Sequence, residues 1–448
     1  MSLLTNVLKL WRTGQYLLPA DSGFMVKHLF ANGEPGFAKL DFSGFAGMYQ
    51  DRARTIPYTA VEQPLGSFTG LNEVTATAPA DVNRGVVSAR VNLLTKTDAA
   101  FSELPWQMVG TTASGSRITA TAVNSNHIRY QTYAHVPNVP VRYMVQVAKK
   151  IGFGFFQLCY SNTNRVKCTV NLETGEFVVS KQGGADAVVT VTDTGTGRWE
   201  ITITGSSSTT IGTGYFNMGL ATSLSEDVNS YQEPVFTGTG EYIDVYEPDL
   251  RLAADSHLPY QRVNTSTDYD TAGFPHYLKF NGTNTAYVTP SIDFSGTDKM
   301  TVWAGVTKLS DAATGMLAEL STGLTGSFYV SAPQGASATY NVRVGGTTLI
   351  SATSPANYAA PITSVLTGIG DTSGDSVILR INGSQVAASA LDQGTGNYGN
   401  YPMYIGGRGG TSLFFNGRLY NLIVRGAQSS LSQIEATENL IRQKMRLP

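Results

Sequence analysis

The stretch that decides the fold is LKFNGTNTAYV, Leu278 to Val288. Asn-Gly tolerates the positive φ angles of a tight turn, so this stretch predicts a strand, a turn and a return strand. A second stretch, FNGRLYNLIVRGAQSSLSQIEATENLI from Phe415 to Ile441, predicts another turn, a long strand and a helix. Ser432 and Glu435 have capping-box spacing, which predicts that the helix begins there. It would turn four residues inward: Ile434, Leu440, Ile441 and Met445.

These two stretches, in this order, resemble the ends of concanavalin A-like, laminin-G-like jelly rolls. The resemblance covers residues 274–448 and implies a two-layer antiparallel sandwich. Together with the strand patterns upstream, it predicts an all-β protein. We expect two antiparallel β-sandwiches of the jelly-roll type in tandem, after an irregular N-terminal segment and before a short C-terminal helix.

Composition bounds the function. The chain has 448 residues, enough for two or three domains. Charged residues make up 14%, glycine occupies 47 positions, and the formal net charge is −2. A charge this small offers no basic field for phosphate backbones, so we expect no nucleic-acid partner. No apolar run approaches the roughly 20 residues of a membrane helix, so we expect no membrane span.

We predict little regular structure for the first 90 residues. Apolar residues at 2–18 recur with a weak helical period, and the sequence after Pro19 shows no regular pattern of apolar residues. The phrases LFANGEPG (29–36) and NRGVVSARVNLL (83–94) resemble the openings of phage and prophage structural proteins. The segment 1–90 is therefore expected to attach the protein to other virion proteins and to oligomerise. A homotrimer is predicted because five aromatic residues there are hard to bury in one chain: Trp11, Phe24, Phe30, Phe37 and Phe45.

Residues 91–252 contain short strands at regular spacing. Patterns typical of β-strands lie at 142–147, 187–191, 198–203 and 241–246, and Gly-rich turns separate them. Trp199, Ile201 and Ile203 alternate with polar residues, as in a half-buried antiparallel strand. An antiparallel sandwich fits this pattern best. Residues 253–273 are predicted to form a polar linker.

This middle segment resembles a carbohydrate-binding-like sandwich of phage head and tail appendages. VNLETGEFVV (170–179) matches its centre, and GEYIDVYEPDLRLAADSHLPYQRVNTSTDY (240–269) matches its end. The resemblance implies a virion protein with a sugar-binding module. The family strand usually ends in Trp-Gly-Ala-Gln-Leu-Glu, but Tyr246 and Glu247 stand at its start here, so no role of that Trp carries over.

The sequence offers no visible catalytic machinery. The histidines are scattered, and residues 274–448 lack the carboxylate array of jelly-roll glycosidases. Cys159 and Cys168 flank a predicted hairpin turn. We interpret them as small apolar residues in a reduced compartment. We therefore expect no enzyme and no cofactor. The laminin-G-like resemblance leaves room for a structural calcium ion, although Asn281 and Asn284 stand where Asp would be the stronger ligand.

One loop is a candidate glycan site. Asn397, Tyr398, Asn400 and Tyr401 combine aromatic rings for the apolar side of a pyranose with amides for its rim. The alternative interpretation, which we favour, is that these rings cover the edge of the sandwich or a subunit contact.

The sequence thus predicts a phage virion structural protein, an appendage or decoration on head or tail that attaches to host-surface glycans. It would be found in the virion, after assembly in the host cytoplasm. A receptor-binding adhesin of the tail and a tail-associated polysaccharide depolymerase are the alternatives. The missing carboxylate array disfavours the depolymerase, and the choice between decoration and adhesin stays open.

Overall fold

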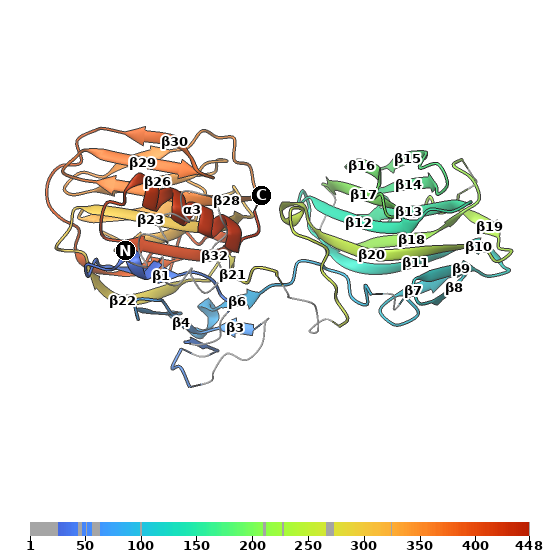
Figure 1. The fold of residues 1–448 in the computed structure, drawn as a ribbon, viewed down its shortest axis with the longest axis horizontal. Coiled ribbons are helices and arrows are strands. Elements are labelled where there is room, and N and C mark those ends of the chain that lie inside the picture. Colours follow the sequence, from blue (N-terminus) through green and yellow to red (C-terminus); the bar gives the residue numbers. More distant parts are fainter. Residues whose placement is uncertain are drawn as a thin grey trace, which may run out of the picture. The chain divides into compact units, whose positions relative to one another are not determined.

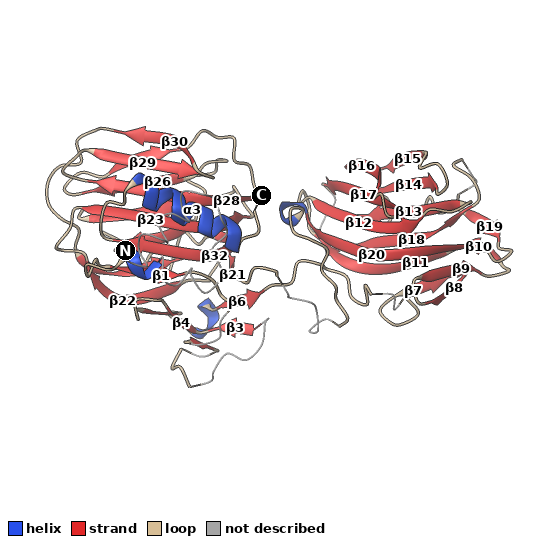
Figure 2. Ribbon diagram, viewed as in Figure 1, coloured by secondary structure: helices blue, strands red, loops and turns tan. Residues whose placement is uncertain are grey.

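The computed structural model describes residues 26–43, 47–50, 52–55, 63–98, 101–208, 212–225, 228–265, 273–323 and 325–447. The chain forms two compact units, one built from residues 1–89 and 273–448 and the other from residues 90–272 (Figure 1). We name them the composite unit and the inserted unit. Both consist of antiparallel sheets, and the one long helix described lies near the C-terminus (Figure 2). The all-β prediction with antiparallel sheets and a short C-terminal helix is confirmed.

The composite unit packs two nine-stranded sheets on one core. The first sheet has the order β3 (Gln63–Leu65), β6 (Gly85–Ser88), β21 (Tyr277–Asn281), β32 (Asn416–Arg425), β23 (Lys299–Lys308), β28 (Ile362–Asp371), β29 (Ser376–Ile381) and β30 (Ser384–Ser389), and β1 (Gly36–Lys39) also pairs with β32. The second has the order β2 (Met48–Tyr49), β4 (Ser67–Thr69), β5 (Thr75–Thr77), β22 (Tyr287–Asp293), β31 (Asn400–Ile405), β24 (Met316–Leu320), β25 (Ser327–Ser331), β26 (Asn341–Gly345) and β27 (Ile350–Thr353). A short 3₁₀ helix, η1 (Asp81–Asn83), precedes β6.

Strands from the N-terminal segment complete both of these sheets. In the first sheet, β1 pairs with β32 and β6 pairs with β21. In the second, β5 pairs with β22. Phe68 from β4 lies in the shared core, with its ring 5.9, 5.4 and 5.0 Å from those of Phe37, Phe42 and Tyr287. The described part of residues 1–90 is thus integral to the C-terminal sandwich.

This placement differs from the separate N-terminal segment that the sequence predicted. The physical reason is that its aromatic residues find a core within the same chain: Phe37 is fully buried, and Phe30 packs against a second apolar cluster. These two rings therefore no longer support a trimer. Trp11, Phe24, Phe45 and the weak helical period at 2–18 lie outside the described residues, and the trimer stays a prediction.

Two local predictions need correction. Asn281-Gly282 does not close a hairpin, because β21 and β22 belong to different sheets. The turn instead carries the chain from one sheet to the other, with Gly282 at a φ of 73°. The helix α3 (Leu431–Lys444) begins before Ser432, because Ser430 is its N-cap and forms the capping box with Gln433. The four residues expected to face inward are buried: Ile434, Leu440, Ile441 and Met445.

The inserted unit packs two six-stranded sheets. The first, which we call the site sheet, has the order β15 (Phe177–Gln182), β14 (Arg165–Asn171), β13 (Phe153–Cys159), β18 (Gly212–Ala221), β11 (Ile128–His135) and β7 (Gln107–Val109). The second has the order β16 (Ala185–Asp193), β17 (Arg198–Ser207), β12 (Val141–Ala148), β20 (Tyr242–Leu252), β9 (Arg117–Ala120) and β8 (Thr111–Ser114). β10 (Asn124–Asn126) and β19 (Val235–Thr237) form a ribbon. All four strands predicted here are present.

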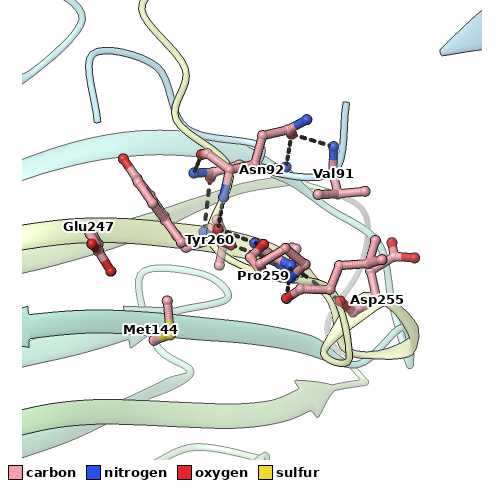
Figure 3. Close-up of polar contacts among 12 residues, drawn as sticks. Val91, Asn92, Met144, Glu247, Asp255, Pro259 and Tyr260 are labelled. Carbon is pink, nitrogen blue, oxygen red and sulfur yellow. Dashed lines mark hydrogen bonds and ion pairs between the residues drawn. The ribbon is translucent and has the colours of Figure 1, made fainter. Parts of the chain in front are cut away.

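A buried polar cluster ties together the two ends of the inserted unit. Gln261 accepts hydrogen bonds from the backbone N–H groups of Val91 and Asn92, at 2.8 and 3.0 Å (Figure 3). The Asn92 side-chain amide donates to the Gln261 carbonyl at 2.9 Å. Beside them, Arg251 forms a buried ion pair with Asp249 and donates to the carbonyls of three residues in the following turn: Asp255, Leu258 and Pro259.

The segment 253–273, expected to be a linker, therefore differs in the structure. Its first part holds the 3₁₀ helix η2 (Ala253–Asp255), and residues 258–263 pack on the inserted unit with Leu258 and Val263 buried. Arg251 is 1% exposed, so its guanidinium must satisfy its donors within the protein, through Asp249 and the carbonyls of this turn.

Phe68→Ala should destabilise the composite unit by about 3 to 5 kcal/mol, because it removes a buried ring from a packed core. Two unfolding transitions followed by calorimetry would show the loss in one unit only. Val82→Ala is the matched control, since Val82 is 73% exposed. An unchanged transition for the composite unit would show that the N-terminal strands are not part of its cooperative core.

Arg251→Met should destabilise the inserted unit by about 3 to 5 kcal/mol, because it leaves Asp249 buried without its partner. The double variant Asp249→Leu/Arg251→Met should recover part of that loss, because it removes the unpaired carboxylate but still leaves the carbonyls of the turn without their donor. Urea unfolding of the three proteins checks both statements. A double variant no more stable than the single one would contradict the account of the pair.

Candidate functional site

A cavity of about 400 Å³ lies on the outer face of the site sheet. Strands β7, β10, β11, β13, β14 and β18 contribute to its wall, and the segment 228–234 closes one side. The lining residues are Val109, Asn126, Ile128, Tyr130, Cys159, Asn162, Arg165, Tyr215, Asn217, Asn229, Tyr231 and Glu233. Aromatic rings and amides dominate this set.

Strand alternation explains why polar groups gather on this face. Neighbouring residues of a strand point to opposite sides, so Phe216 and Met218 enter the core while Tyr215 and Asn217 face outward. Register then places three polar side chains in one row, because Asn217 stands opposite both Gln157 on β13 and Tyr130 on β11. The row is fixed by backbone pairing and does not depend on a flexible loop.

The segment after β18 brings a second set of groups over this row. Asn229 accepts hydrogen bonds on its side-chain oxygen from the backbone N–H groups of Tyr231 and Glu233, at 2.8 and 3.1 Å. The Tyr231 carbonyl accepts from Gln157 at 3.0 Å and from Arg165 at 2.6 Å. The segment is therefore anchored to β13 and β14 through its backbone, which leaves the Tyr231 ring outside.

Glu233 is the centre of the polar network. Its carboxylate accepts hydrogen bonds from the amides of Asn126, Asn229 and Asn217, at 2.6, 2.9 and 3.2 Å. Asn217 also donates to the Gln157 side-chain oxygen at 2.7 Å. Both hydrogens of the Asn217 amide are thus used within the protein. A network held in this way is preorganised.

The aromatic groups frame the network. Tyr231 is 49% exposed, and the Arg165 guanidinium lies 5.2 Å from its ring centroid. The rings of Tyr130 and Tyr215 meet edge to face at 6.1 Å. Burial, with smaller contributions from Tyr215 and Glu233, raises the pKa of Tyr130, so it remains a neutral phenol.

The cavity contains a thiol that is not activated. Burial raises the pKa of Cys159 to about 12, although Arg165 acts in the opposite direction. The protonated thiol is a poor nucleophile. Cys159 and Cys168 lie on neighbouring strands, as predicted, but Cys168 stands opposite Phe156 and belongs to the core on the other face. Both cysteines are free and buried.

The four residues of the loop predicted to bind glycan have different environments in the structure. Tyr398 is only 2% exposed and packs in the core of the composite unit, 5.1 Å from Phe328. It cannot stack on a sugar, so its assignment was wrong. Asn397 donates to the Ser295 carbonyl at 2.7 Å. Asn400 is exposed and Tyr401 is 38% exposed, and their role in binding stays a prediction.

Sequence reasoning missed the cavity on the site sheet. A signal was present, since Gln157 and Asn217 interrupt otherwise apolar strands, but nothing in the sequence places those strands side by side. No structure or function was predicted for the segment from Asn229 to Glu233. Its hydrogen bonds to the sheet span long separations, such as Gln157 to Tyr231, and only the fold brings them together.

No metal site emerges in the part of the chain that the structure describes, where no group of three His, Cys, Asp or Glu residues could hold an ion. The calcium ion stays a prediction. Asn281 uses its side-chain oxygen to accept from three backbone N–H groups of its own turn, those of Thr283, Asn284 and Thr285. No described helix is long and apolar enough to span a membrane.

No protein-family model matches the chain, and no curated relative was found. Among solved structures, it is similar to the carbohydrate-binding module CBM40 of the Ruminococcus gnavus IT-sialidase bound to α2,3-sialyllactose, with 18% identity over 32% of this chain and 83% of that chain and a TM-score of 0.27. A heptameric SAP-like pentraxin from Limulus polyphemus matches at 13% identity, over 36% and 80%, with a TM-score of 0.30. Domains LG4-5 of the mouse laminin α1 chain match at 11%, over 77% and 94%, with a TM-score of 0.29. At these values the likenesses say nothing about what this chain binds, and none of these three is described as a phage protein.

Tyr398→Ala should destabilise the composite unit by roughly 3 kcal/mol or more, because the ring fills a packed core. Tyr401→Ala should change stability by no more than about 0.5 kcal/mol, since its ring lies at the surface. Thermal unfolding of both variants compares the two neighbouring tyrosines directly. Equal effects would mean that Tyr398 is not a core residue.

Proposed function

We propose that this protein binds carbohydrate in the cavity on the site sheet. The observation that carries the proposal is the exposed Tyr231 ring beside a preorganised set of amides around Glu233. An aromatic face accepts the apolar side of a pyranose, and oriented polar groups bind its hydroxyls.

The anchoring of the segment 228–234 supports this proposal. Tyr231 stays exposed although its carbonyl is bonded to Gln157 and Arg165, so the backbone that carries the ring is held before any ligand arrives. Binding to a group on an anchored backbone costs less conformational entropy than binding to one on a mobile loop. The side chains beneath it come from strands, which adds rigidity.

We also propose binding without catalysis. Glycoside hydrolysis generally uses two carboxylates across the scissile bond. Among the described residues that line the cavity, Glu233 is the one carboxylate, and its oxygens accept hydrogen bonds from three amides. This arrangement suits a carboxylate that orients neighbours. The polysaccharide depolymerase remains the weaker alternative.

The biological setting that we propose is a phage virion, where the protein would be a head or tail appendage attached to host-surface glycans. The support comes from the resemblance of the N-terminal and middle segments to phage structural proteins. A tail receptor-binding adhesin would use the same cavity. A homotrimer, and contact with other virion proteins through the N-terminal segment, belong to this proposal.

Tyr231→Ala should weaken carbohydrate binding by about fivefold, because a stacked ring contributes on the order of 1 kcal/mol. A glycan array followed by calorimetric titration of the best ligand measures the effect. Tyr401→Ala is the matched control, since it removes a similarly exposed ring from the other unit. Full binding by Tyr231→Ala with loss in Tyr401→Ala would move the site to the loop predicted from sequence.

A further inference from the structure

We infer that the cavity selects uncharged saccharides and rejects those that carry a carboxylate or a sulfate. This inference rests on the proposed function and adds the ligand class. The inference is based on the hydrogen bonds of the charged groups at the cavity, which decide whether those groups can contact a ligand.

The cation of the cavity is not available to an anion. Arg165 is only 3% exposed, and its two terminal nitrogens already donate to the backbone carbonyls of Tyr231 and Asn162. Recognition of a carboxylate by arginine depends on a pair of parallel N–H groups that face the ligand. Here both terminal nitrogens are taken by the protein's own backbone, and Nε is buried without a partner, so no such pair is accessible and Arg165 supports Tyr231.

The charge of Glu233 is not cancelled by its hydrogen-bond partners. Arg165 lines the same cavity and partly offsets that charge, but it offers an anion no free pair of donors. Glu233 is 7% exposed, and its three partners, the amides of Asn126, Asn217 and Asn229, are neutral. These donors satisfy the carboxylate but leave its charge, which is screened poorly at a partly buried position. A ligand carboxylate or sulfate would meet a like charge close to the amides that it needs.

The remaining polar groups favour hydroxyl donors. Both amide hydrogens of Asn217 are taken by Gln157 and Glu233, so the group that this side chain could offer a ligand is its oxygen, an acceptor. Tyr130 donates its hydroxyl hydrogen to Gln107 at 2.7 Å, so its oxygen can only accept from a ligand. Sugar hydroxyls carry the hydrogens that such acceptors require, whereas carboxylates and sulfates carry none.

The test uses the full chain and a panel of neutral oligosaccharides of hexoses and N-acetylhexosamines, each matched with a counterpart bearing one sialic acid, uronic acid or sulfate. We expect the acidic member to bind at least about tenfold more weakly than its neutral match, since facing like charges costs affinity. The neutral affinity should stay constant between low and high salt, because no ion pair forms. Tyr231→Ala reports whether each ligand uses this cavity.

The outcomes separate the two proposals. Acidic glycans that bind as well as neutral ones, with sensitivity to Tyr231→Ala and to salt, would overturn the selectivity and leave carbohydrate binding intact. Binding of neither class would overturn both. Glu233→Gln gives a second measurement: if the variant keeps its folded stability, its discrimination against acidic ligands should fall by several-fold. Undiminished discrimination in a folded variant would assign the selectivity to another group.

Discussion

The pairing of β6 with β21 is the constraint on which the rest of this structure depends. Val87 stands opposite Leu278, so a sheet of the composite unit is closed by residues from both sides of the inserted unit. The two ends of the inserted unit must therefore return to adjacent strands, which are about 4.8 Å apart. The hydrogen bonds between Asn92 and Gln261 meet this requirement by joining the two ends before the chain leaves the unit.

The same arrangement explains how the inserted unit carries a binding site. Its two sheets pack on a core of their own, which forms the scaffold for the cavity. The buried pair of Asp249 and Arg251 fixes the turn that follows β20. On the site sheet, register aligns Gln157, Asn217 and Tyr130. Gln157 then holds the backbone of residue 231, and Asn217 holds Glu233.

The sequence predicted the fold class well, because alternation and turn residues are local signals. The strand at 198–203 could be read directly, since Ile201 and Ile203 alternate with polar residues and are buried. The segments that make up each unit could not be predicted in this way. The pairing of β1 with β32 joins residues almost 390 positions apart, as Phe37 opposite Val424 shows, and short strands without a periodic pattern give no hint of it.

The candidate site was the least predictable part. Tyr398 and Tyr401 look alike in sequence, yet one is a core residue and the other lies at the surface. Their difference follows from strand β31, whose start at Asn400 leaves Tyr398 in the preceding turn, packed on Phe328. The cavity on the site sheet combines residues from six strands and two loops, and only the tertiary register assembles Glu233 with its amides.

Amide hydrogen exchange, measured by mass spectrometry on the full chain with and without a bound neutral oligosaccharide, tests the central claim most directly. A ligand in the cavity should slow exchange at 126–131, 157–165, 215–219 and 228–234, because it reduces local opening of the segments that line it. Peptides around Tyr401 should exchange at the same rate in both states. Protection confined to residues 397–405, with none on the site sheet, would contradict the account.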